Sequence, residues 1–410
     1  MANIHDVARL AGVASVTVSR FLNASGPVSS ASRRKIEAAV DALGYVPNAL
    51  AQGLKSRATH TIGLVVSDVT NPFFTSIARG VEDVAQQAGY SVILCNSDEN
   101  VEKQAIYLEV LRRKRMDGLL IAPASEDGRA ILEWSRHCGP VCILDRTISH
   151  VDVQAVGIDV VRSDSVDAAE RLVTHLVSHG HRRIGIITGP EDISTASARL
   201  EGYRRSLRTS DISPDPTLER RGPFTVESGY AAAASLLNES QPPTAIFAAN
   251  NFITIGVLAA LRDRGLSVPQ RVAVVGFDEI PQIALAAPFL TVAAQAATTV
   301  GRQGARFLLE RVSALRGGGP PPAGHELVLE TEMIIRQSCG CPVDEAPGLS
   351  SMGLQFRASD LYRQSGQVAS DGSPLDIDHV PSKPATTGKQ KGRDQAVVGG
   401  HRGGRLRGET

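Results

Sequence analysis

The chain has 410 residues, which is more than one ordinary domain needs and indicates two or three. Apolar residues make up 42% of it, enough for buried cores, and no apolar run approaches the roughly 20 residues of a membrane-spanning helix. The net charge is zero, but residues 1–60 hold seven basic and three acidic side chains, whereas residues 61–340 hold 27 and 32. A basic head on a mildly acidic body indicates a nucleic-acid-binding module attached to a second function.

The head, residues 1–46, is predicted to form three short helices. Asn3 is placed to cap the first helix, and Leu10 is expected on its buried side. A second helix is expected over residues 15–22, and a third helix follows Ser29. Two short helices joined by a tight turn are typical of a helix-turn-helix, whose second helix enters the major groove of DNA.

Residues 47–60 are interpreted as a linker. Within them, residues 48–55 can form about two helical turns, and an isolated helix of that length is marginal in water. We therefore expect this hinge helix to fold only when DNA or a second copy of the chain supports it.

Residues 61–338 alternate apolar runs of strand length with amphipathic stretches such as Ser76–Ala88. The runs span residues 61–68, 90–98, 117–125, 140–146, 182–190, 244–251 and 272–279. This alternation predicts an α/β body of two doubly wound lobes with parallel sheets. Ligands of such folds bind at the carboxyl ends of the strands.

The last segment, residues 339–410, is predicted to be a disordered tail, because residues 341–410 contain only 12 Leu, Ile, Val and Phe among 70. The five cysteines are an odd number, which indicates reduced thiols. Neither Cys339-x-Cys341 nor Cys138-x3-Cys142 has a second Cys or His couple at zinc spacing. A solvated helix end accounts for the neighbouring His175, His179 and His181, and we expect neither a metal nor a cofactor.

The head motif "IHDVARLAGVASVTVSRFLN" (4–23), followed by "GYVPN" (44–48), resembles the DNA-binding head of the LacI/GalR family of transcriptional regulators. The body motifs "TNPFF" (70–74), "LDR" (144–146) and "VVGFDE" (274–279) resemble the effector domain of the same family. The resemblance implies a small all-α helix-turn-helix head on an α/β body similar to type I periplasmic binding proteins. It also implies a homodimer on a palindromic double-stranded DNA operator.

By that resemblance the second helix contacts base edges. Arg20 suits a bidentate contact to guanine, and Val16 suits a thymine methyl group. Leu54 stands where the family inserts an apolar wedge into the minor groove. Ala14 departs from the Ser that usually caps this helix in the family. The candidate DNA-contacting residues are Ser15, Val16, Thr17, Ser19, Arg20, Asn23 and Leu54.

Ten residues near the strand ends match the pocket pattern of ribose-binding members of this fold. They are Asn71, Phe73, Phe74, Asp145, Arg146, Arg199, Phe224, Asn250, Asp278 and Gln295. The phenylalanines offer apolar faces to a sugar ring, and the planar polar groups form paired hydrogen bonds to adjacent hydroxyls. Two carboxylates balance two guanidiniums, which favours a small neutral sugar, with ribose first. Asn251 departs from the Asp that is usual in the family.

We therefore expect a cytoplasmic, nucleoid-associated repressor of sugar-utilisation genes. Release from DNA by the sugar is favoured over corepression, because neutral sugars usually signal a pathway to be opened. The alternative is a solute-binding protein of a sugar transporter, which the DNA-binding head and the missing signal peptide disfavour. No nucleophile motif or Gly-rich phosphate loop follows a strand, so we expect no enzymatic activity.

Overall fold

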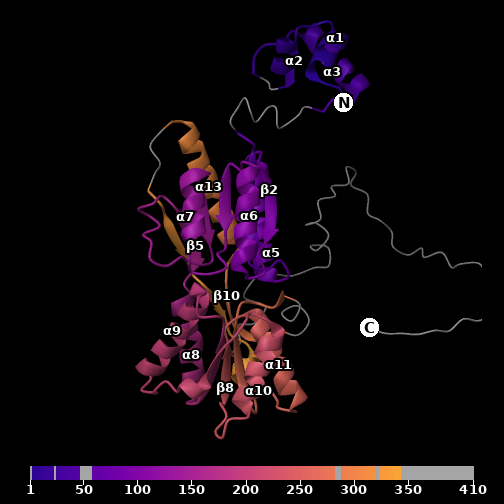
Figure 1. The fold of residues 1–410 in the computed structure, drawn as a ribbon. Coiled ribbons are helices and arrows are strands. Elements are labelled where there is room, and N and C mark those ends of the chain that lie inside the picture. The colour runs from indigo at the N-terminus through magenta and orange to yellow at the C-terminus, as the bar shows by residue number, and fades with distance from the viewer. Residues whose placement is uncertain (1, 23–24, 47–57, 282–287, 319–322, 343–410) are drawn as a thin grey trace, which may run out of the picture. The chain divides into compact units, whose positions relative to one another are not determined.

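The computed structural model describes residues 2–22, 25–46, 58–281, 288–318 and 323–342 (Figure 1). Asn23, the whole expected hinge helix (48–55) with Leu54, and all but the first four residues of the expected tail lie outside the described residues. Among the described residues, no helix is both long and apolar enough to cross a membrane.

The head consists of three helices, α1 (Ile4–Ala11), α2 (Ser15–Leu22) and α3 (Ser30–Leu43). Asn3 caps α1 as expected, in a reciprocal capping box with Asp6. Gly12 ends α1 with a φ of 65°, a left-handed conformation that glycine adopts without strain.

The three helices of the head share a small apolar core that includes the fully buried Val7, Val18 and Ile36. Leu10 does not belong to it: this side chain is 57% exposed, contrary to the sequence expectation. The reason is that α1 buries the stripe of Val7, Ala8 and Ala11, and Leu10 lies beyond the edge of that stripe.

The first lobe of the body contains a six-stranded parallel sheet of order β11-β5-β4-β3-β1-β2. Its strands are β1 (Thr61–Val66), β2 (Ser91–Asn96), β3 (Gly118–Ile121), β4 (Val141–Leu144), β5 (Asp159–Ser163) and β11 (Glu326–Leu329). One face packs against α5 (Pro72–Gln87) and α13 (Ala297–Arg316), and the other packs against α6 (Val101–Arg113) and α7 (Arg129–His137).

The second lobe repeats this plan with the strand order β12-β10-β9-β8-β6-β7, in which only β12 is antiparallel to its neighbour. Its strands are β6 (Ile184–Thr188), β7 (Glu219–Arg221), β8 (Ala245–Ala248), β9 (Ala273–Phe277), β10 (Thr291–Ala294) and β12 (Glu332–Ile334). Its helices are α8 (Ser165–Ser178), α9 (Ser194–Thr209), α10 (Val226–Leu237) and α11 (Asn251–Asp263). Because the two orders correspond, β4 in the first lobe is equivalent to β9 in the second.

All seven apolar runs in the sequence form strands, which confirms the predicted pair of parallel-sheet lobes. The chain passes between the lobes three times, after β5, after β10 and after β11, rather than completing one lobe before the other. The helix expected from Ser76 begins earlier, at Pro72, because Asn71 caps it.

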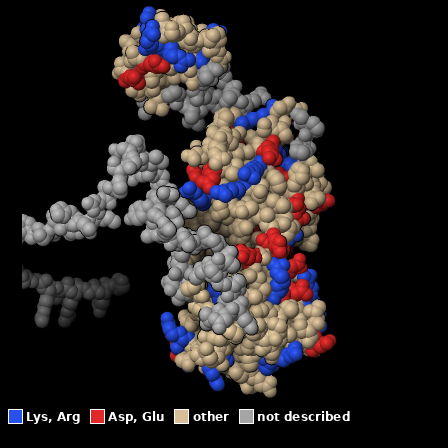
Figure 2. All heavy atoms as spheres, turned by 180° about the vertical axis from the view of Figure 1, so that it is seen from behind, with Lys and Arg blue, Asp and Glu red and all other residues tan. Residues whose placement is uncertain are grey.

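The surface of the body carries both signs of charge. On the face drawn in Figure 2, the basic and acidic side chains of its described residues are interspersed. Ion pairs of the body include Arg204 with Glu219 and Arg220 with Glu239. The described residues on this face therefore form no extended basic surface of the kind that binds a DNA backbone.

Candidate functional site

The exposed face of α2 carries the predicted DNA contacts. Val16 is 56% exposed and Arg20 is also exposed, whereas Ser15, Thr17 and Ser19 are half-buried. The Ser15 hydroxyl lies 3.0 Å from Nδ1 of His5, which joins the start of α2 to α1. Val16 and Arg20 are thus the most accessible members of the predicted set, and their contacts to DNA stay a prediction.

A cavity of about 570 Å³ lies where the carboxyl ends of the two sheets face each other. Nine of the ten predicted effector residues line it, and the tenth, Gln295, stands behind it and donates to Asp278 from 2.6 Å. The lining residues are Asp68, Thr70, Asn71, Phe73, Phe74, Asp98, Glu99, Asp145, Arg146, Pro190, Thr195, Arg199, Pro223, Phe224, Thr225, Asn250 and Asp278.

Two aspartates occupy equivalent positions in the two lobes. Asp145 follows β4 and Asp278 follows β9, with φ values of 65° and 70°. Each backbone N–H donates over 2.8 Å to the neighbouring strand, to Val161 and Ala293 respectively. Positive φ at a residue other than glycine is strained, and such strain concentrates at functional sites. The fold thus turns one carboxylate from each lobe into the cavity.

The two cavity arginines are held differently. Arg146 is buried and forms a bidentate ion pair with Glu99, with N···O distances of 2.5 and 2.6 Å. Arg199 stacks on the Phe277 ring, 3.8 Å from its centroid, and donates to the Ala249 carbonyl over 2.7 Å. Arg199 therefore has no carboxylate in direct contact among the described residues, and it remains the cation best placed to meet a ligand.

Four polar atoms of the predicted effector residues are buried without a hydrogen-bond partner in the described part of the chain. They are Oδ1 of Asp145, Nε of Arg146, Nε of Arg199 and Oε1 of Gln295. Leaving such an atom unpaired costs roughly 1–3 kcal/mol. A set with two acceptors and two donors matches ligand groups that both donate and accept, which is the property of hydroxyls.

Aromatic rings form the apolar part of the cavity. Phe73 and Phe74 meet edge to face with centroids 5.2 Å apart. The Phe224 ring lies so close to Gly189 that a Cβ at this position would come within 2.2 Å of it. Gly189 thus sets how far the Phe224 ring stands back from the cavity.

Asn71 and Asn251 join the two lobes through their side-chain amides. Asn71 donates to Asn251 over 3.2 Å, and Asn251 donates back over 2.8 Å. Much of the hydrogen-bonding capacity of Asn71 is therefore used by the protein itself. Asn250 caps α11 through its Oδ1, so a ligand would meet its Nδ2. An Asp at position 251 could not donate to Asn71, which gives the departure from the family pattern a structural consequence.

Sequence reasoning missed three carboxylates of the cavity, Asp68, Asp98 and Glu99. All three follow strands β1 and β2, so their position at carboxyl strand ends was the available signal. They also change the expected charge balance of the cavity, because its two arginines face five acidic side chains rather than two. The cavity is thus acidic. It is less suited to a phosphate than a pocket with two carboxylates and two guanidiniums would be.

Burial changes the ionisation of both strand-end aspartates. It raises the pKa of Asp145 from 3.8 to about 6, even though Arg146 and Arg199 favour the charged form. Burial likewise raises the pKa of Asp278, against Arg199 and Gln295. Above about pH 6, Asp145 is therefore a poorly solvated carboxylate that accepts hydrogen bonds readily.

The sequence matches two family descriptions. Residues 59–326 match the periplasmic binding proteins and sugar binding domain of LacI family, and residues 3–48 match the bacterial regulatory proteins, lacI family. The first match alone covers more than half of the chain.

Three similar proteins agree with these matches. The ribose operon repressor of Escherichia coli (strain K12) is 36% identical over 315 residues, 76% of this chain and 94% of that protein. The HTH-type transcriptional repressor PurR of Haemophilus influenzae (strain PittEE) is 33% identical over 82% of this chain and 98% of its own. The crystal structure of the Lac repressor dimer bound to operator and the anti-inducer ONPF superposes with a TM-score of 0.71 at 28% identity, covering 82% of this chain and 99% of that one.

Head, two-lobed body and relatives therefore lead to one assignment: the chain belongs to the LacI family of DNA-binding transcriptional repressors.

Proposed function

We propose that the chain represses genes by binding a palindromic operator as a homodimer, and that a small neutral sugar, ribose first, releases it. Acting at the nucleoid in the cytoplasm, it would control genes for use of that sugar. The observation that carries the sugar proposal is the set of three unpaired polar atoms of Asp145, Arg146 and Arg199, residues that line the cavity together with aromatic rings. The similarity to a ribose operon repressor supports the choice of ribose.

The chemistry of the cavity favours hydroxyls over other ligand groups. Among the lining residues, Asp145 holds an unpaired acceptor, and Arg146 and Arg199 each hold an unpaired donor. The excess of carboxylates disfavours phosphates by charge repulsion. A pocket built for buried hydroxyls also discriminates strongly, because an analogue that lacks one leaves a charged partner unpaired.

Effector binding between the lobes would act on DNA through their relative placement. A ligand changes a conformational equilibrium only by its difference in affinity for the two states. Asn71 and Asn251 already connect the lobes beside the cavity. A sugar bound there would contact both lobes and so stabilise one relative placement of the lobes over the other. In our proposal that arrangement withdraws support from the two hinge helices and lowers operator affinity.

The homodimer is supported by exposed apolar side chains of the first lobe. Leu94 on β2 is 48% exposed, and Ile106 and Val110 on α6 are 63% and 38% exposed. Ile106 and Val110 are four residues apart and share one helix face. A second copy of the chain would cover such a surface. Sedimentation equilibrium tests this by comparing the dimer dissociation constants of Ile106→Glu and the unchanged protein. The variant should separate into monomers at a higher protein concentration.

The effector proposal is tested by calorimetry with ribose, xylose, galactose and a purine. Ribose should bind one site per chain, and 2-deoxyribose should bind at least tenfold more weakly. No heat of reaction from sugar turnover is expected, since the proposed role is binding only. Binding of the purine alone would refute a sugar effector. Binding of galactose alone would keep the sugar class and refute ribose.

A further inference from the structure

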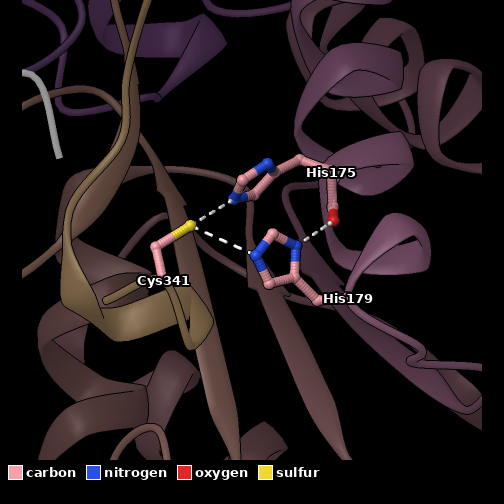
Figure 3. A group of neighbouring side chains, drawn as sticks. All are labelled: His175, His179 and Cys341. Carbon is pink, nitrogen blue, oxygen red and sulfur yellow. Dashed lines mark hydrogen bonds between the residues drawn. The ribbon is translucent and has the colours of Figure 1, made fainter. Parts of the chain in front are cut away.

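Two histidines and a cysteine meet at the C-terminal end of α8, as Figure 3 shows. Sγ of Cys341 lies 3.2 Å from Nε2 of His179 and 3.5 Å from Nε2 of His175. Sγ of Cys339 lies 3.2 Å from the same nitrogen of His175. None of these four residues lines the effector cavity, so the cluster is a separate feature of the second lobe.

The separations match those of a tetrahedral metal site. With Zn–N bonds of about 2.05 Å and Zn–S bonds of about 2.3 Å, neighbouring N and S ligands lie about 3.5 Å apart. The two N···S distances from Cys341 are 3.2 and 3.5 Å. The ligand atoms of His175, His179 and Cys341 all lie within 4.8 Å of one another, so one ion can contact all three.

The ring of His179 is oriented as a metal ligand would be. Its Nδ1 lies 2.9 Å from the backbone carbonyl oxygen of His175, a contact that requires the proton on Nδ1 (Figure 3). Nε2 then carries a lone pair and points at Cys341. Histidine ligands of metals characteristically donate their second N–H to such a partner, which fixes the tautomer.

Without a metal, the two thiols and the two imidazole nitrogens contact one another. Cys341 faces both nitrogens and can donate its one thiol proton to only one of them at a time, while the thiol of Cys339 also lies within reach of His175. A cation bound to the thiolate would satisfy both nitrogens at once. Cys339 has further partners, because its thiol lies 3.1 Å from the Arg336 carbonyl and accepts from the Thr291 hydroxyl.

We propose that His175, His179 and Cys341 bind one Zn²⁺ ion, whose fourth coordination position a water molecule can fill. Imidazole nitrogens and a thiolate are donors that zinc prefers. The histidines lie one helical turn apart on α8, and the cysteines flank Gly340 after the last strand. The ion would fasten the segment that follows β12 to α8. The His and Cys couples lie some 160 residues apart in the chain, which is why the sequence alone predicted no metal.

The test uses the full chain, reduced, stripped of metal with a chelator, and titrated with Co²⁺ and then Zn²⁺. We expect one Co²⁺ per chain, with the visible bands of a tetrahedral site and a near-ultraviolet thiolate-to-cobalt band that Zn²⁺ abolishes. Cys341→Ser should lose the thiolate band or weaken binding at least tenfold. Cys138→Ser and His181→Ala should match the unchanged protein, since Cys138 lies in the first lobe and His181 contacts Thr244 instead.

A second variant guards against misfolding. His179 is exposed, so His179→Gln should leave the fold intact while weakening metal binding at least tenfold. Zn²⁺ should raise the Tm of the unchanged protein and not that of His179→Gln. Absence of stoichiometric Co²⁺ binding would overturn the proposal. So would equal binding by the unchanged chain and both variants, which would place the metal elsewhere on the chain.

Discussion

Replacing Asp145 with Asn should stabilise the ligand-free protein while removing its response to effector. A pKa raised from 3.8 to about 6 means that the folded protein disfavours ionised Asp145 by roughly 3 kcal/mol. The pKa of Asp145 is higher in the folded than in the unfolded protein, so ionising this carboxyl lowers the free energy of unfolding. The reduction is absent below about pH 4, grows as the pH rises, and is complete above about pH 6. An amide has the shape of the carboxylate without the charge, so Asn removes the penalty.

The free energy of unfolding of Asp145→Asn should therefore exceed that of the unchanged protein by up to roughly 3 kcal/mol at pH 8, and by about half as much at pH 5. Urea unfolding of the ligand-free proteins at both pH values measures this. Glu201→Gln, a change in an exposed ion pair with Arg208, is the control and should shift stability by no more than about 0.5 kcal/mol. An equal destabilisation by Asp145→Asn at both pH values would refute the reasoning, since it would mean that the carboxylate stabilises the fold.

Four further substitutions test the two binding sites. Arg20→Ala should cost roughly 1–3 kcal/mol of operator binding and relax specificity at one base of each half-site; an equal loss on every sequence would instead indicate a phosphate contact. Leu54→Ala should reduce the operator bend angle without changing sugar affinity, and an unchanged bend would exclude the wedge. Arg199→Ala should abolish the sugar response and keep operator binding, as measured by calorimetry and fluorescence anisotropy. Gly189→Ala should push Phe224 toward the cavity and weaken sugar binding at least tenfold, whereas unchanged affinity would show that the ring can move aside.

Much of the fold could be predicted from the sequence because its strands are buried on both faces. Such strands are continuous apolar runs, and every run of this kind became a strand. The strands that were missed are short or polar: β7, the triplet Glu219–Arg221, lies at a sheet edge where polar side chains reach solvent. The three passages of the chain between the lobes could not be predicted from local sequence patterns either. Which strands pair over long sequence distances depends on tertiary packing and not on the residues near each strand.

The cavity was predicted in part for a similar reason. Strand ends place residues such as Asp145 and Asp278 at one edge of each sheet, and this much follows from topology. Which atoms remain unpaired depends on neighbours, and the pairing of Glu99 with Arg146 joins residues 47 positions apart. The same limit hid the cluster of His175, His179 and Cys341, whose members come together only when the second lobe folds.

The central claim is that a neutral sugar in the cavity releases the operator. The most direct measurement is operator affinity by fluorescence anisotropy, on a site selected from random DNA, as ribose is titrated. Operator affinity should fall as ribose saturates the protein, 2-deoxyribose should require at least tenfold higher concentration, and Arg199→Ala should bind the operator without responding. Operator affinity that stays constant while calorimetry shows ribose bound, or that rises with ribose, would contradict the account.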